Sequence, residues 1–239
     1  MHIAIVGLGP SANQYLEITK RLGGRRAYCD ETWCINALGD VFACDLIFHM
    51  DDVRIQQIRA DAKPKSNIAR MLDWLKTTKT PVVTSRAHPD YPALSEFPLA
   101  EVLQRFPLGY FNSTAAYAVA YAIYSGATKI SLFGMDFTYD KATHAEKGRA
   151  CVEFWLGIAS EMGVEIALPK TTSLMDAYHS QADRFYGYDT LDLSITRDET
   201  GQIAIEKTPR AVLPTADQIE RSYDHSAPIS QQHIRQDLI

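Results

Sequence analysis

Short apolar runs alternate with helix-like stretches along the first two thirds of the chain. Six runs, four to six residues long, have apolar centres and are bounded by polar or turn residues, as is typical of strands buried in a sheet. They are residues 3–6, 32–36, 45–49, 80–85, 129–133 and 164–168. Apolar residues at helical spacing lie between them, at residues 11–22, 67–77, 114–125 and 145–162.

This alternation over residues 1–169 predicts an α/β fold: a Rossmann-like, doubly wound, mostly parallel sheet with helices on both faces. Residues 86–109, which carry four prolines, do not fit the alternation. They are expected to form a long loop, of a length that often serves as a functional loop or lid.

The last quarter of the chain has a different pattern. Residues 191–196 and 202–207 alternate about a turn that contains Gly201, which predicts a β-hairpin. A polar tail with a short helix at 216–223 follows. We therefore expect a nucleotide-binding domain of residues 1–179. Residues 180–239 would be a small appendage that covers a sheet edge or forms the interface of a homo-oligomer.

Composition excludes several classes of protein. The chain has 239 residues, 46% of them apolar and 22% charged, and its net charge of −5 gives no general attraction to nucleic acid. No apolar run approaches the ~20 residues that span a bilayer, and the first strand lacks the features of a signal peptide. We therefore expect a cytoplasmic protein. The four cysteines match no zinc pattern, so no metal site is predicted from them.

The first strand leads directly into a glycine-rich turn. Gly7 and Gly9 allow a tight turn and a close approach of the backbone to a ligand. Pro10 suits the first turn of a helix, and Ser11 is a candidate cap. A strand, a Gly-rich turn and a helix in this order often cradle a phosphate. The third glycine of the dinucleotide fingerprint is absent, so an ordinary strand-to-helix turn is the alternative.

A second helix-strand unit brings more candidate residues to the same edge of the sheet. Asn112, Ser113 and Thr114 stand where a helix begins, and free backbone N–H groups are expected there. The strand at 129–133 ends in Gly134 and leads to Asp136, at the edge where open α/β sheets bind ligands. Asp136 is a candidate ligand of a ribose hydroxyl or a metal, or else a turn cap.

The order of these motifs resembles bacterial sialyltransferases of the Campylobacter lipooligosaccharide type. The residues that carry the resemblance, over roughly residues 1–175, are Gly7-Leu8-Gly9-Pro10-Ser11, Cys34-Ile35-Asn36, Phe48-His49-Met50-Asp51, Asn112-Ser113-Thr114 and Ile130 to Phe137. The same core is similar to archaeal-type 6-hydroxymethyl-dihydropterin diphosphokinases and to motility accessory factors that modify flagellin. No single motif decides between these branches.

The sialyltransferase resemblance implies transfer with inversion from a nucleotide sugar, with a CMP-sugar favoured and no cofactor required. It implies that the nucleotide and its phosphate are bound by Gly9, Ser11, Asn36, Ser113 and Thr114. It also places His144, within the segment THAEKGRACVEFW, in the role of the catalytic base. Tyr139 is the candidate for the tyrosine that contacts the phosphate in that family.

The chain departs from that family at three places. Only residues 138–143 stand where the family has a long segment that covers the acceptor. Phe111 aligns with an arginine of the family, and Asp51 stands near the position of an asparagine. These departures leave the donor, the acceptor and the reaction open.

Two other functions therefore stay open. Asp51 and Asp52 at a strand end could hold Mg²⁺, which an ATP-dependent diphosphokinase requires, although Asp52 could instead cap a helix at residues 52–58. A noncatalytic nucleotide-binding module is the third possibility. In each case the expected partner is a nucleotide or nucleotide sugar, and the sequence does not define the acceptor.

Overall fold

The protein is described from a computed structural model, in which residues 1–137, 142–179, 184–188 and 190–218 are described; the side chains of residues 142–144 are not. The chain divides into two compact units, Met1–His179 and Ser180–Ile239. Each unit is considered by itself below. No helix in the described ranges is both long enough and apolar enough to cross a membrane.

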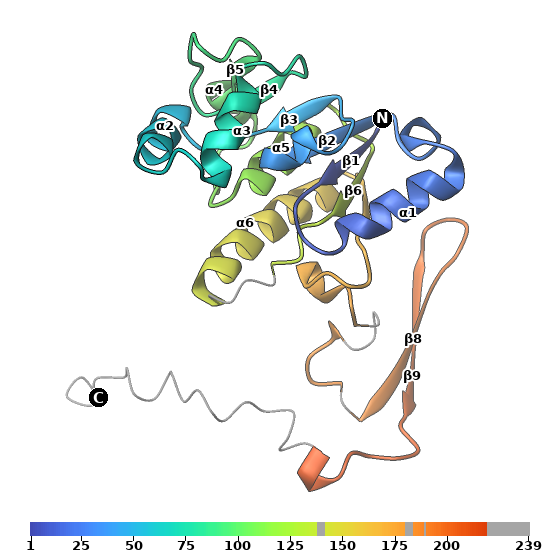
Figure 1. The fold of residues 1–239 in the computed structure, drawn as a ribbon. Coiled ribbons are helices and arrows are strands. Elements are labelled where there is room, and N and C mark those ends of the chain that lie inside the picture. The colour runs from blue at the N-terminus through green and yellow to red at the C-terminus, as the bar shows by residue number, and fades with distance from the viewer. Residues whose placement is uncertain (138–141, 180–183, 189, 219–239) are drawn as a thin grey trace, which may run out of the picture. The chain divides into compact units, whose positions relative to one another are not determined.

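The first unit is built on a seven-stranded sheet in the order β5-β4-β3-β2-β1-β6-β7 (Figure 1). Every neighbouring pair is parallel. The strands are β1 (His2–Val6), β2 (Glu31–Ile35), β3 (Leu46–Phe48), β4 (Val82–Thr84), β5 (Leu94–Glu96), β6 (Lys129–Phe133) and β7 (Glu165–Ala167). The predicted Rossmann-like, doubly wound fold is confirmed.

Helices cover both faces of this sheet (Figure 1). Residues of α1, α2 and α3 pack on one face, and residues of α4, α5 and α6 pack on the other. Their bounds are α1 (Ala12–Leu22), α2 (Val53–Ala62), α3 (Asn67–Leu75), α4 (Leu99–Arg105), α5 (Thr114–Tyr124) and α6 (Ala142–Glu161). Short 3₁₀ helices are η1 (Arg25–Ala27), η2 (Asn36–Asp40) and η3 (Leu174–Asp176).

The strands are apolar throughout because both of their faces are covered. In β1, Ile3 and Ile5 pack against α5 and α6, whereas Ala4 and Val6 pack on the side of α1 and α3. All four side chains are fully buried. The period of two that normally marks a half-exposed strand is therefore replaced by a continuous apolar run.

The expectation of a long loop at residues 86–109 is wrong. The segment contains β5, which extends the sheet through the pairing of Val82 with Leu94, and the helix α4. Pro98 precedes the first turn of α4, a place that tolerates proline, and Val102 is fully buried. Apolar residues at 99, 102, 103 and 106 have helical spacing, so the pattern was present among the prolines.

The second unit contains a two-stranded antiparallel sheet of β8 (Leu191–Arg197) and β9 (Ile203–Pro209). This confirms the predicted hairpin. In its turn, a carboxylate oxygen of Asp198 accepts hydrogen bonds from the backbone of Thr200 and Gln202. A helix begins at residue 216, as predicted, and the rest of the predicted 216–223 helix lies outside the described residues.

Candidate functional site

The topology places a switch point between β1 and β6. From β1 the chain builds outward through β2, β3, β4 and β5, and it then returns to the other side of β1 to form β6 and β7. The loops that follow β1 and β6 therefore leave the sheet in opposite directions. In doubly wound sheets, the crevice at the carboxyl ends of the strands beside such a point is the usual ligand site.

Glycine is required here because two backbone segments touch each other. Gly7 N–H donates to Phe133 O, and Gly9 N–H donates to Gly134 O, both at 2.7 Å. A Cβ atom on Gly7 would lie 2.5 Å from the carbonyl oxygen of Gly134. Gly134 itself has φ +67°, a left-handed conformation that favours glycine. These glycines thus allow the close approach of two loops, and Gly7 and Gly134 also line the cavity described below.

Ser11 and Asp136 join the same two loops. The Ser11 amide donates to Asp136 Oδ2 at 2.8 Å, and the Gly134 amide donates to Ser11 Oγ at 2.7 Å. Both side chains are buried. Of the two interpretations of Asp136, its contacts are those of a turn cap. A Cβ atom on Gly9 would meet Asp136 Oδ2 at 2.5 Å, so Gly9 packs against this pair as well.

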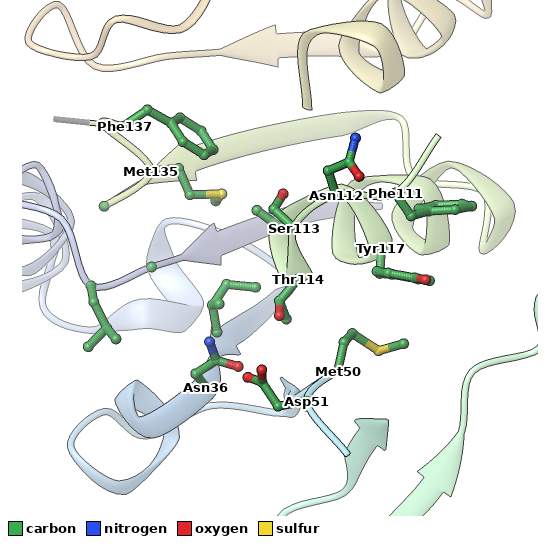
Figure 2. A pocket seen from close by; sticks show the side chains of 15 residues that line it. Asn36, Met50, Asp51, Phe111, Asn112, Ser113, Thr114, Tyr117, Met135 and Phe137 are labelled. Atoms are coloured by element: carbon green, nitrogen blue, oxygen red, sulfur yellow. The ribbon is translucent and has the colours of Figure 1, made fainter. Parts of the chain in front are cut away.

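A cavity of about 470 Å³ opens at the switch point (Figure 2). Seven of the predicted site residues line it: Gly7, Asn36, Asp51, Asn112, Ser113, Thr114 and Gly134. Four others do not: Gly9, Pro10, Ser11 and Asp136. The loop joining β1 to α1 therefore contributes Gly7 and Leu8 to the wall, whereas Gly9 and Ser11 hydrogen-bond the loop after β6.

One wall of the cavity is the N-terminus of α5. Ser113 is the N-cap, and its hydroxyl accepts a hydrogen bond from the Ala116 amide at 3.3 Å. Thr114 and Ala115 form the first helical positions and line the cavity. The first amides of a helix have no partner within it and carry the positive end of the helix dipole. This wall therefore presents hydrogen-bond donors and a positive partial charge.

A second wall is aromatic. The Phe111 ring stacks on Tyr117 at a centroid distance of 4.3 Å and on Trp155 at 5.0 Å. Figure 2 shows Phe111 and Tyr117 from α5 and its leading loop on one side of the cavity, with Met135 and Phe137 across from them. The sequence analysis did not assign Tyr117, Met135 and Phe137 to the site. For Tyr117 a signal was available, because it is an aromatic residue in the first turn of a helix that begins at the edge of the sheet where ligands bind.

Polar side chains without partners gather at the same edge of the sheet. In the described part of the chain, four buried side-chain atoms have no hydrogen-bond partner: Asn36 Oδ1, His49 Nδ1, Thr84 Oγ1 and Asp136 Oδ1. All four residues end a strand or follow one closely. Because buried polar groups are usually paired, this concentration marks the carboxyl edge as the part of the molecule with unused hydrogen-bonding capacity.

Asp52 is the N-cap of α2. Its side chain accepts a hydrogen bond from the Arg54 amide at 2.9 Å and pairs with the Arg54 guanidinium. The hydrogen bonds from Arg54 lower the pKa of Asp52 to about 2. Its carboxylate is thus engaged in helix capping, which was the alternative to a Mg²⁺ site. Among the described residues, no group of three His, Cys, Asp or Glu side chains is placed to hold a metal.

His49 is buried beside this helix and does not reach the cavity. Its Nε2 hydrogen-bonds Gln56 Oε1 at 2.9 Å, and burial lowers the pKa of its imidazole. The two predicted catalytic residues cannot be placed in the same way. Tyr139 lies outside the described residues, and so does the side chain of His144, whose backbone belongs to the first turn of α6.

The sequence matches no known family model, and no curated protein is significantly similar to it. Among solved structures, the chain is similar to the sialyltransferase CstII from Campylobacter jejuni with cytidine-5'-monophosphate (13% identity, TM-score 0.40, 92% of this chain and 98% of that one). It is also similar to CstII with a trisaccharide acceptor and CMP (13% identity, TM-score 0.42, 92% and 98%) and with CMP-3FNeuAc (14% identity, TM-score 0.41, 92% and 97%).

TM-scores this low carry no argument about function. The three structures are all described as sialyltransferases.

Proposed function

We propose that this protein is a glycosyltransferase that uses a nucleotide sugar, with a CMP-sugar as the favoured donor. The observation that carries the proposal is a switch-point cavity with the α5 N-terminus on one wall and the Phe111–Tyr117 stack on another. A volume of about 470 Å³ lies within the range of small-molecule sites. The ordered motifs that resemble the sialyltransferases point to the same edge of the sheet.

Each wall has a chemical role in this proposal. The amides of Thr114 and Ala115 hold the phosphate, because a helix N-terminus offers donors and a positive potential. The Phe111 and Tyr117 rings offer an apolar face to the base or the sugar. Loss of the nucleotide from the sugar leaves a charged phosphate, and the same amides stabilise that charge as it develops.

His144 is proposed as the general base that takes the proton of the acceptor hydroxyl. The acceptor oxygen then bonds to the donor carbon from the face opposite the departing CMP, whose bond to the sugar breaks, so the configuration at that carbon is inverted. An imidazole has an ordinary pKa near neutrality, which suits this task. The role rests on the sequence resemblance and on the position of His144 in the first turn of α6. We propose that no metal is required, because the helix N-terminus supplies the positive potential.

The first test is nucleotide binding, measured by the shift in melting temperature with CMP, CDP, UDP, GDP, ADP and ATP, each with Mg²⁺ or with a chelator. A ligand that binds only the native state raises the melting temperature by mass action. We expect a shift with CMP that survives the chelator. A shift with ATP alone that requires Mg²⁺ would instead favour the diphosphokinase, and no shift with any nucleotide would overturn the proposal.

A charge variant tests the wall that holds the phosphate. Thr114→Asp places a carboxylate at the first position of α5, which suits the helix but repels a phosphate in the cavity. We expect the CMP shift to disappear while the protein without ligand stays as stable as the parent. Asn67→Asp is the matched control, because Asn67 is the first residue of α3 and does not line this cavity.

Turnover then separates an enzyme from a binding module. We expect His144→Ala to abolish transfer from a CMP-sugar while the CMP-induced shift in melting temperature is retained. Retained turnover would remove His144 from the proposed role. Binding without turnover by the parent protein, over a panel of CMP-sugars and acceptors, would favour the noncatalytic module.

A further inference from the structure

Another part of the cavity wall has the opposite chemical character to the α5 N-terminus, because it carries hydrogen-bond acceptors. Asn36 and Asp51 line it, and they follow neighbouring parallel strands, β2 and β3. Figure 2 shows the oxygen atoms of both side chains turned toward the same part of the cavity, below Thr114 in that view. Among the lining residues that the structure describes, Asp51 is the one carboxylate, and none carries a cationic side chain.

Asn36 is held in an unusual conformation. Its φ is +53°, in the left-handed region that asparagine tolerates better than most residues. It begins η2 directly after β2. Its side-chain oxygen is screened from solvent and has no donor among the described residues. The end of the cavity beside β2 therefore contains an unsatisfied acceptor.

Asp51 adds a charged acceptor. Its side chain is exposed, and no hydrogen bond or ion pair to it is found within the described part of the chain. The neighbouring Asp52, by contrast, is fully engaged in capping α2 and pairing with Arg54. An ionised carboxylate accepts hydrogen bonds and donates none. A ligand group that binds beside Asp51 must therefore donate.

Few groups of a nucleotide can donate a hydrogen bond to a carboxylate. A phosphate would be repelled by Asp51 and is attracted to the α5 N-terminus instead. The ribose cis-diol carries two hydroxyl donors on adjacent carbons, and a carboxylate placed after a strand of a doubly wound sheet is a suitable partner for it. Hydrogen bonds to a charged acceptor are the stronger kind.

We propose that Asp51 is a specificity-determining residue that selects ribonucleotides over 2′-deoxyribonucleotides by accepting hydrogen bonds from the ribose diol, at the end of the cavity beside Asn36. This inference rests on the proposed binding of a nucleotide in the cavity. It goes further by stating which sugar the nucleotide must carry and which end of the cavity that sugar occupies.

The test is a binding cycle measured by titration calorimetry with CMP and 2′-deoxy-CMP. The parent protein should bind CMP about tenfold more tightly than 2′-deoxy-CMP, the effect expected for a lost hydrogen bond to a charged group. Asp51→Ala should weaken CMP, which loses both hydroxyl partners, about tenfold more than 2′-deoxy-CMP, which keeps only the 3′-hydroxyl, so that the preference disappears. Because Asp51 is exposed, the variant should melt at the parent temperature.

Asp73→Ala is the matched control, since Asp73 is an exposed carboxylate on α3 that does not line this cavity. It should leave both affinities unchanged. Equal binding of the two nucleotides by the parent, or an equal loss of both in Asp51→Ala, would overturn the selection by Asp51 while leaving nucleotide binding intact. If neither nucleotide binds the parent, the proposed donor itself is wrong, and the two failures are thus distinguished.

Discussion

At the scale of single residues, the glycines had the clearest signal in the sequence, and the structure shows a further role for them in the contact between two loops. Gly7 and Gly9 were predicted to let the backbone approach a ligand. Together with Gly134, they also let the loops after β1 and β6 cross in direct backbone contact, through the hydrogen bond from Gly9 to Gly134. The position of the turn could be predicted from local chemistry, but its partner loop lies more than a hundred residues away.

The contact between these two loops predicts that two Gly→Ala variants differ greatly in their free energy of unfolding. Gly126 and Gly134 both have positive φ, at +80° and +67°, so Ala at either position is strained by about 1 kcal/mol. A Cβ atom at Gly126 meets nothing within 4 Å, whereas at Gly134 it overlaps the carbonyl of Gly7. We expect Gly134→Ala to lose at least ~3 kcal/mol of unfolding free energy in urea titrations. Equal losses in the two variants would contradict the role of the crossing loops.

At the scale of elements, α6 supports the wall of the cavity at Gly148, where the missing side chain leaves room for the Phe137 ring. Phe137 lines the cavity with φ +50°, which is strained for a bulky residue. Its ring lies against Gly148 of α6, where a Cβ atom would come within 2.6 Å of the ring. Two side-chain hydrogen bonds hold the chain just before this ring, from Thr172 to Met135 O and from Ser173 to Asp136 O.

Two glycines of the same helix test this support. Gly157→Ala adds a Cβ that meets nothing within 4 Å, so it should stabilise the protein by about 0.5–1 kcal/mol through helix propensity. Gly148→Ala gains the same propensity but must displace the Phe137 ring. We expect it to be less stable than Gly157→Ala and to show a smaller CMP-induced shift in melting temperature. The same stability and the same shift in both variants would show that Phe137 does not depend on Gly148.

At the scale of the whole molecule, every residue that lines the cavity in the described part of the chain belongs to the first unit, Met1–His179. The core clusters that hold the sheet also lie within that unit. The hairpin of β8 and β9 forms a separate sheet, and strand residues such as Ile203 and Ile205 are exposed on it. Nucleotide binding should therefore depend on the first unit.

A truncation tests this dependence. A chain that ends at His179 keeps all seven strands of the parallel sheet and all six α-helices of the first unit. We expect it to fold cooperatively, as measured by circular dichroism during heating, and to show the same CMP-induced shift in melting temperature as the full chain. A folded truncation that no longer binds CMP would show that residues beyond 179 contribute to the site.

The sequence by itself determined six of the seven strands, the starts of α1, α3 and α5 and the glycine turns of the first unit, because apolar periodicity and turn chemistry act over a few residues; α6 begins at Ala142, three residues before the predicted start. It missed β5 and α4, where four prolines obscured a helical spacing. Only the tertiary structure decided which side chains face the cavity and which face each other. Ser11 and Asp136, 125 positions apart, hydrogen-bond one another through Asp136 Oδ2, whereas no partner for Asn36 Oδ1 or the Asp51 carboxylate is found in the described part of the chain. That distinction depends on where distant loops meet at the sheet edge, and no local pattern in the chain encodes it.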